Sequence, residues 1–304
     1  MSESSEFSEL AQRDRSLSDS KSEDSALKTQ LQLLISANHI LHHHNLVDAF
    51  GHISIRNPVN PSEYIIAAYD PGAPALVSKF TDLITYHVSD STPVDPNAAK
   101  GYSERYIHGE IFARWPEVNC VIHSHSEAVI PFMTSNIQIK PVFHMAGFLG
   151  AEGPRTFDVT KLYTTMDKGE YSPDMLIKSA YLGQSLAQGF RESGKDGEGP
   201  APVVLQHKHG FTCVGESIQR AVYRAIYLQK NCELLQKSIG LMGDGMGSVS
   251  YLTEEEAEGC RQMNELTEDK AFRLWLREVE VNPLYHNAEG VPRDLPVGGM
   301  KDVH

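Results

Sequence analysis

The sequence predicts an α/β fold built around a mostly antiparallel sheet. Short segments rich in β-branched and aromatic residues, with proline and glycine between them, are typical of strands joined by tight turns. Longer stretches with apolar residues at helical spacing alternate with these segments. The 304-residue chain is 40% hydrophobic and 22% charged. This composition is that of a globular protein with a substantial core.

The amino-terminal part of the chain divides at residue 26. Residues 1–25 are rich in serine and acidic side chains and have almost no aliphatic ones, so they bury too little surface to offset the entropy of ordering. We expect a disordered tail there. From Ala26 the apolar residues predict an amphipathic helix up to about His44. The histidine run at its end is interpreted as cations favoured at a helix C-terminus rather than as a metal site.

Four segments with strand character and two helices follow. The first three strand segments are separated by turn signals such as Asn57-Pro58, which favour an antiparallel arrangement. Ser103 precedes a helix that ends at Arg114, before Trp115-Pro116, because the residue before a proline disfavours the helical conformation. The expected strands are residues 52–56, 64–68, 83–87 and 119–125, and the second helix covers 126–133.

The second half of the chain is predicted to be mainly helical. The strongest amphipathic pattern follows Ser217, which is a favourable N-cap residue. We expect one domain over 26–283, with its core at 26–240, and a C-terminal tail at 284–304. The further elements expected are a helix at 175–190, a loop at 194–200, a strand from 202–207 toward Gly210, a helix at 217–239, a linker at 240–250 and a last helix at 253–281.

Charge and cysteine content exclude several classes of function. Twenty-seven basic and forty acidic side chains give a net charge of -13, which opposes binding to phosphate backbones. No apolar run reaches the roughly 18–20 residues of a membrane span, and the first residues lack the apolar core of a secretory signal. Four cysteines without Cys-x-x-Cys spacing indicate free thiols. We therefore expect a cytoplasmic protein that binds neither nucleic acid nor membranes.

Histidines supply the sharpest chemical signal. His123 and His125 end an apolar strand, so their side chains project from one face about 6–7 Å apart along the backbone. His209 ends a second apolar strand just before a glycine, and Glu104 opens the helix that leads into the first strand. Three imidazoles, a carboxylate and an open position are typical of a catalytic metal site. The spacing by itself also allows ordinary packed histidines.

Four motifs stand in a fixed order along the chain. They are Gly51-His-Ile-Ser-Ile-Arg56, Ser103-Glu104, the run from Trp115 to His125, and Leu205-Gln-His-Lys-His-Gly210, with the helix at 217–239 after them. In this order the chain resembles the class II aldolase/adducin family over about residues 26–240. The resemblance implies a three-layer α/β/α sandwich around the sheet. It also implies a homotetramer with active sites at the subunit interfaces.

The resemblance assigns roles to individual residues. It makes His123, His125 and His209 the ligands of one divalent metal per subunit, with zinc expected and Fe2+ or Mn2+ as alternatives. Glu104 becomes the acid/base group, and His207 is the alternative third ligand. The expected contacts to a small-molecule substrate are His52, Ser103 and His144.

The chain departs from the sugar-phosphate aldolases of this family at two positions. His52 stands where they have an asparagine that helps to bind phosphate. Met145 stands where the fuculose-phosphate aldolase branch has a proton-donating tyrosine, and Tyr102 or Tyr285 are candidate replacements for that donor. A phosphorylated sugar is therefore disfavoured as a substrate.

The resulting hypothesis is a metal-dependent lyase that cleaves or forms a C–C bond in a small, non-phosphorylated carbonyl compound or carboxylic acid. Aldol chemistry and decarboxylation both stay open, because both place negative charge on an oxygen that a metal stabilises. The lost phosphate contacts favour decarboxylation slightly. The alternatives are an Fe(II)-dependent oxygenase on the same fold and a non-catalytic, adducin-like interaction module.

Overall fold

A seven-stranded mixed sheet forms the centre of the protein. The computed structural model describes residues 3–71, 73–135, 137–165, 172–190, 199–242, 247–293 and 295, with side chains from residue 23 onward. The strands are β1 (His52–Arg56), β2 (Glu63–Ala67), β3 (Leu83–His87), β4 (Cys120–Ser124), β5 (Arg155–Phe157), β6 (Val203–Gln206) and β7 (Gly210–Gly215). Their order is β3-β2-β1-β4-β7-β6-β5, and each neighbouring pair is antiparallel except the parallel pair β5–β6. The mostly antiparallel sheet is therefore confirmed.

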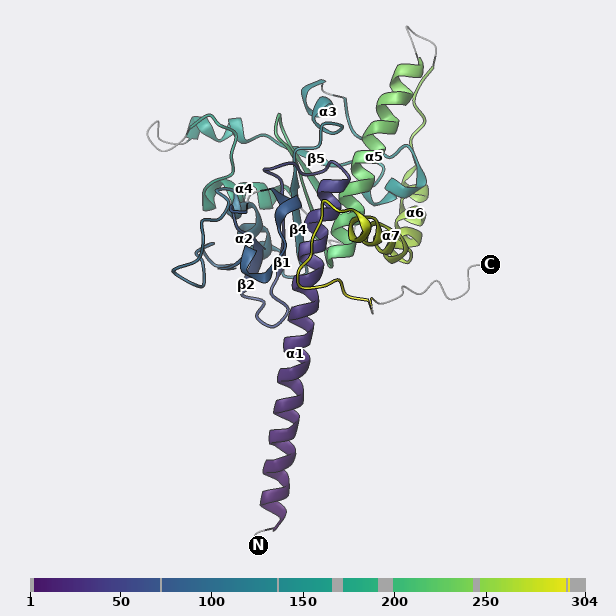
Figure 1. The fold of residues 1–304 in the computed structure, drawn as a ribbon. Helices are drawn as coiled ribbons and strands as arrows, with labels where there is room; N and C mark the ends of the chain where they lie inside the picture. Colours follow the sequence, from purple (N-terminus) through teal and green to yellow (C-terminus); the bar gives the residue numbers. More distant parts are fainter. Residues whose placement is uncertain are drawn as a thin grey trace, which may run out of the picture.

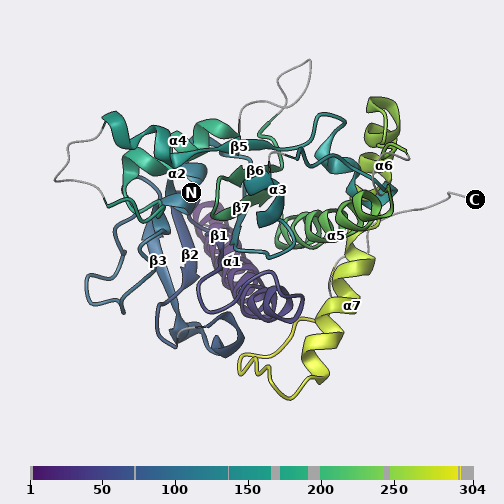
Figure 2. The same cartoon turned by 90° about the horizontal axis from the view of Figure 1, so that it is seen from above.

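Helices cover both faces of this sheet (Figures 1 and 2). Side chains alternate across a strand, and along β4 Ile122 packs in one hydrophobic cluster while Val121 packs in another. The α-helices are α1 (Glu3–His43), α2 (Arg105–Arg114), α3 (Ile130–Ser135), α4 (Ala180–Gly189), α5 (Ile218–Met242), α6 (Glu254–Glu265) and α7 (Glu268–Val281). The first cluster includes residues of α1 and α5, and the second includes residues of α2 and α4. This is the expected α/β/α sandwich.

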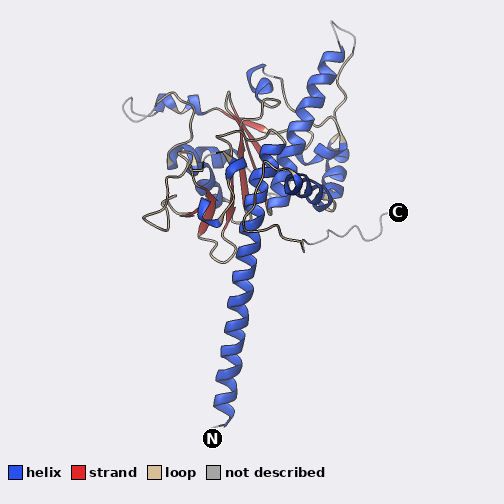
Figure 3. Cartoon of the chain, in the orientation of Figure 1, coloured by secondary structure: helices blue, strands red, loops and turns tan. Residues whose placement is uncertain are grey.

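The first helix is longer than expected. It begins at Glu3, so most of the segment expected to be a disordered tail is helical. Figures 1 and 3 show that this part of α1 extends away from the rest of the protein. The correction has a simple cause: no glycine or proline interrupts residues 3–43, and extending an existing helix costs far less than nucleating one. Later in the helix, apolar side chains such as Leu34 and Ile40 are buried.

Two turns in the second half differ from the expected pattern. The strand expected to run toward Gly210 ends at Gln206, and the chain turns at 207–209 into β7, which pairs with β4. The turn is hidden in the sequence because its left-handed position is Lys208, with φ 58°, rather than a glycine. The last helix is broken between α6 and α7, because α6 packs against the 310 helix η3 (His144–Leu149) while α7 packs against α1 and α5.

The ends and loops follow the expectations in part. Within the expected tail, residues 285–293 pack on the protein: Tyr285 is buried, and Asn287 donates its side-chain N–H to the Gln32 carbonyl of α1 at 2.9 Å. Most of the loop expected at 194–200, the centre of the linker and residues 296–304 lie outside the described residues. In the described part of the chain, no helix has the length and apolar character needed to cross a membrane.

Candidate metal centre

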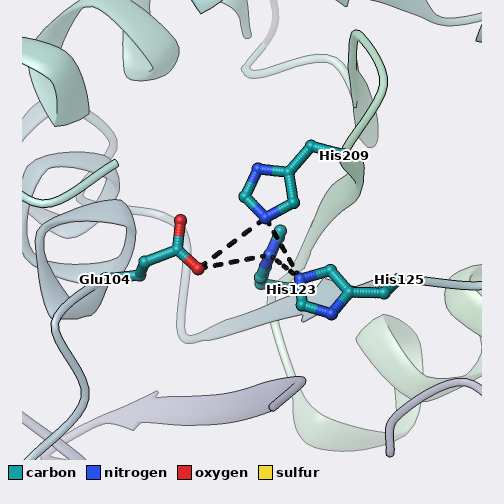
Figure 4. Close-up of side chains that lie close together, drawn as sticks. All are labelled: Glu104, His123, His125 and His209. Carbon is teal, nitrogen blue, oxygen red and sulfur yellow. Dashed lines mark hydrogen bonds and ion pairs between the residues drawn. The ribbon is translucent and has the colours of Figure 1, made fainter. Parts of the chain in front are cut away.

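Four side chains from separate segments converge where β4 ends (Figure 4). Glu104, His123, His125 and His209 each offer one ligand atom, and these atoms lie within 4.8 Å of one another. His125 Nε2 is 3.0 Å from His123 Nε2 and 3.1 Å from His209 Nε2. Glu104 Oε2 is 3.7 Å from His123 Nε2 and 3.8 Å from His209 Nε2. The residues singled out by sequence spacing thus form one cluster.

The sheet brings the three histidines together. His123 lies in β4 at the centre of the sheet, and His125 follows directly after that strand. His209 belongs to the turn between β6 and β7. A Cβ on Gly210 would lie 2.0 Å from the Ser124 carbonyl oxygen, so only glycine lets this turn approach β4 closely enough.

Glu104 is held in place by a backbone hydrogen bond. It occupies the N-cap position of α2, and its side chain is buried. Its Oε1 accepts the Ile177 N–H at 2.9 Å, which leaves Oε2 facing the histidines. Burial raises the pKa of Glu104 to about 7, although the Ile177 hydrogen bond opposes the rise. The carboxyl group can therefore exchange a proton near neutral pH.

The histidines are neutral, as metal ligands must be. Burial lowers the pKa of His123 well below its usual value, lowers that of His125, and lowers that of His209 to about 4. His123 Nδ1 is 3.1 Å from the Phe211 carbonyl oxygen, which can only accept a hydrogen bond. Gln206 Nε2 lies 3.2 Å from the same Nδ1. A metal bound at Nε2 would place the proton of His123 on Nδ1, where the Phe211 carbonyl can accept it.

This arrangement fits a divalent metal ion. Tetrahedral ligation with bonds of about 2.0–2.1 Å places ligand nitrogens roughly 3.3 Å apart, close to the spacings of His125 to its two neighbours. One proton on His125 Nε2 can satisfy only one of those two contacts. A cation between the rings satisfies all the lone pairs at once. Three imidazoles and a carboxylate are the donor set of a catalytic type of metal site.

The expected substrate contacts lie at different distances from this cluster. His52 is buried beside it, with its ring centroid 5.1 Å from that of His123. Ser103 is exposed and precedes Glu104. His144 is exposed at the start of η3, and its recorded contacts, with Phe143 and Asn264, lie outside the cluster.

The alternative metal ligand and the two alternative proton donors named from the sequence lie outside the cluster of four side chains. His207 is half-buried outside the group of four, and its N–H bonds to the Phe157 carbonyl. Tyr285 bonds to His42, whereas the Tyr102 ring lies 4.8 Å from that of His52. Met145 packs against the core, and its backbone carbonyl accepts the hydroxyl of a tyrosine in α5.

Comparison with known proteins decides the family. The model of the class II aldolase and adducin N-terminal domain matches residues 32–235. The chain belongs to this family. It is 41% identical over 263 residues to Decarboxylase tropJ of Talaromyces stipitatus, a match that covers 84% of this chain and 96% of the relative.

More distant relatives agree with this membership. The 3,4-dihydroxyphthalate decarboxylase of Arthrobacter keyseri is 25% identical over 195 residues, 62% of this chain and 69% of that protein. The structure of L-fuculose 1-phosphate aldolase from Glaciozyma antarctica superposes with a TM-score of 0.63 at 16% identity, over 87% of this chain and 94% of that one. The resemblance seen in the four motifs is confirmed. This chain is accordingly a lyase of the aldolase and decarboxylase type. Its family depends on a divalent metal.

Sequence reasoning missed the residues that support the cluster. Ile177 is an apolar residue that acts through its backbone, and no pattern marks it. His108 contacts His52 from α2, and Ser54 of β1 contacts His108 in turn. His108 did have a signal, because it stands four residues after Glu104 and so shares its face of the helix.

Proposed function

We propose that this class II aldolase protein is a zinc-dependent decarboxylase of a small, hydroxylated carboxylic acid without a phosphate group. The observation that carries the proposal is the match to a decarboxylase over nearly the full length of both chains. The Glu104 and three-histidine cluster supports it, because it supplies the groups that the reaction needs. The 3,4-dihydroxyphthalate decarboxylases among the relatives favour an aromatic acid with a hydroxyl next to the carboxylate.

The reaction breaks the bond between the carboxylate and the ring or chain carbon. CO2 leaves, the electron pair stays on the carbon, and a proton must replace the carboxylate there. A divalent cation bound by the three histidines would stabilise the negative charge that develops on the neighbouring substrate oxygen. Glu104 is suited to deliver the proton, because its Oε2 lies 3.7 Å from His123 Nε2, next to the position of the cation. Its hydrogen bond to Ile177 keeps the side chain aimed at the cluster.

Zinc is the proposed ion because three imidazole nitrogens and an open position are its usual catalytic ligand set. Fe2+ and Mn2+ accept the same ligands. Activity with iron that consumes oxygen would instead favour the oxygenase alternative.

Release of CO2 tests the proposal directly. The protein loaded with Zn2+, Mn2+ or Fe2+ is mixed with 2,3-dihydroxybenzoate, 3,4-dihydroxyphthalate or L-fuculose 1-phosphate, and CO2 and aldehyde products are measured. We expect CO2 from a hydroxylated aromatic acid and none with His125→Ala. Aldehyde release from the sugar phosphate without CO2 from either acid would overturn the proposal.

We also propose a homotetramer in the cytoplasm with active sites between subunits. The exposed position of His144, outside the cluster of its own chain, suits a role in the site of a neighbour. Exposed Leu234 of α5 and Leu274 of α7 offer apolar contact surface. Four free cysteines suit a reducing compartment. Light scattering should give four times the chain mass of 33.8 kDa, and a monomer would contradict the assembly.

A further inference from the structure

A buried chain of hydrogen bonds leads from the sheet to the edge of the metal centre. Ser54 Oγ of β1 is 2.6 Å from His108 Nδ1, and His108 Nε2 is 2.7 Å from His52 Nδ1. All three side chains are almost completely buried. His52 pairs with His123 across β1 and β4, so both rings lie on the same face of the sheet.

The far end of this chain has no partner within the protein. His52 Nε2 is buried, and in the described part of the chain no hydrogen-bonding group reaches it. An unpaired buried polar atom is costly unless a ligand or water meets it. The two ring nitrogens of an imidazole point in different directions, so Nε2 is directed away from His108. The position next to His123 makes a bound substrate the natural partner.

The direction of the hydrogen bonds follows from the serine. His108 Nδ1 is the single partner recorded for Ser54 Oγ among the described residues. A buried hydroxyl that only accepts would leave its own hydrogen unpaired, whereas one that donates leaves only lone pairs unused. Ser54 therefore donates to His108 Nδ1. His108 is neutral, since burial lowers its pKa to about 3, so its one proton sits on Nε2 and is donated to His52 Nδ1.

We propose that Ser54 and His108 hold His52 in the tautomer with hydrogen on Nε2, which donates to an acidic oxygen of the substrate beside the metal. His52 then binds the substrate, and Ser54 and His108 are positioning residues. The inference rests on the proposed function for the nature of the substrate, an acid with a carboxylate and an adjacent hydroxyl. Either oxygen can accept this hydrogen bond.

The tautomer can be measured without any turnover. Long-range 1H–15N NMR of the 15N-histidine-labelled, zinc-loaded protein distinguishes a protonated from a bare ring nitrogen, and His52→Phe assigns the signal. We expect His52 with hydrogen on Nε2 and none on Nδ1. A bare Nε2 would overturn the inference while leaving the proposed decarboxylase untouched. Should His52→Phe fail to fold, His52→Gln supplies the assignment instead.

Ligand binding then tests the role of the donor. Benzoate and catechol serve as probes for the carboxylate and the hydroxyl, and calorimetry gives their affinities. His52→Phe should weaken at least one of them roughly tenfold or more, as expected for loss of a hydrogen bond to a charged group, while zinc content stays unchanged. The affected probe identifies the oxygen that His52 binds. Unchanged affinity for both probes would overturn the assignment.

A double substitution separates positioning from a merely structural role. His108→Phe should reduce the population with hydrogen on Nε2 of His52 and weaken the same probe. The double variant His52→Phe with His108→Phe should bind that probe as weakly as His52→Phe alone, because His108 acts through His52. Additive losses would contradict the positioning role. Ser36→Ala, which removes a buried hydroxyl on α1, should leave both the tautomer and the affinity as in the wild type.

Discussion

At the scale of single residues, function depends on which atom carries a proton. One buried ring and two half-buried rings stay neutral and turn nitrogens toward one point, while the buried carboxyl group beside them has a pKa of about 7. Burial causes both effects, because it disfavours the charged form of an acid and of a base alike. The same desolvation thus leaves neutral ring nitrogens beside a carboxyl group of raised pKa.

Replacement of Glu104 by glutamine tests its role in proton transfer. Glu104→Gln keeps the size of the side chain and an oxygen that can accept the Ile177 N–H, but it cannot give up a proton in the same way. We expect the rate of CO2 release to fall about 100-fold or more, with metal still bound. Glu110→Gln, a buried glutamate further along α2, is the matched control. Wild-type turnover in Glu104→Gln would rule out the proton-donor role.

The four residues of the cluster could be predicted from the sequence, whereas most of the residues that hold them and His52 in position could not. His123 and His125 show themselves by their spacing on a strand, and His209 by the glycine after it. Ser54 and Ile177 are ordinary buried residues whose importance arises only from contacts across the fold, whereas His108 could have been noticed by its position four residues after Glu104. His144 stays a prediction, because its expected role requires a second subunit.

At the scale of elements, the turn between β6 and β7 decides whether the metal centre can form. It carries His209 and lies against the end of β4 through Gly210. Apolar runs predicted the strands. This turn, however, has Lys208 rather than a glycine at its left-handed position, and the break between α6 and α7 contains neither glycine nor proline. Packing against separate partners sets both of them.

A methyl group on Gly210 should damage both stability and metal binding. In Gly210→Ala the new Cβ would meet the Ser124 carbonyl, and relief of that overlap moves His209 away from His125. We expect a loss of about 1–3 kcal/mol in the free energy of unfolding and weaker zinc binding, measured by urea unfolding and by competition with a chelator. Gly259→Ala in α6, where a Cβ meets nothing within 4 Å, should keep wild-type zinc affinity. Equal affinity in both variants would refute this explanation.

The helix α1 should make the protein sensitive to acid. Burial lowers the pKa of His39 to about 4, and its Nε2 lies 2.7 Å from the Val77 carbonyl oxygen. Because an unfolded histidine has a pKa of about 6.5, the unfolded chain binds more protons between pH 6.5 and 4. The contribution of neutral His39 to the free energy of unfolding is therefore fully present above pH 6.5, and it is lost as the pH falls toward 4.

Urea unfolding at pH 7 and pH 5 measures this effect. We expect His39 to contribute about 1–2 kcal/mol to the loss of stability between these pH values, so His39→Gln should show a smaller loss than the wild type. His43→Gln, near the half-buried end of the same helix, controls for the introduction of glutamine. An identical pH dependence in His39→Gln and the wild type would exclude His39 as a source of the acid sensitivity.

At the scale of the whole molecule, the sandwich places the cluster of Glu104 and three histidines where the central strands end. The α/β/α architecture followed from short strands, amphipathic helices and four motifs in the order of the family. The long first helix did not follow, since composition measures how much surface a segment buries and not whether a helix already formed extends into it. The arrangement of subunits also stays a prediction, because it depends on contacts between chains.

The metal content of the purified protein tests the central claim most directly. The wild type, His123→Ala and His207→Ala are purified without added metal or chelator, and the bound metals are measured by mass spectrometry. The account predicts about one divalent ion per chain, chiefly zinc, in the wild type and in His207→Ala, and almost none in His123→Ala. A wild-type protein without stoichiometric metal, or a His123→Ala variant that keeps it, would contradict the account.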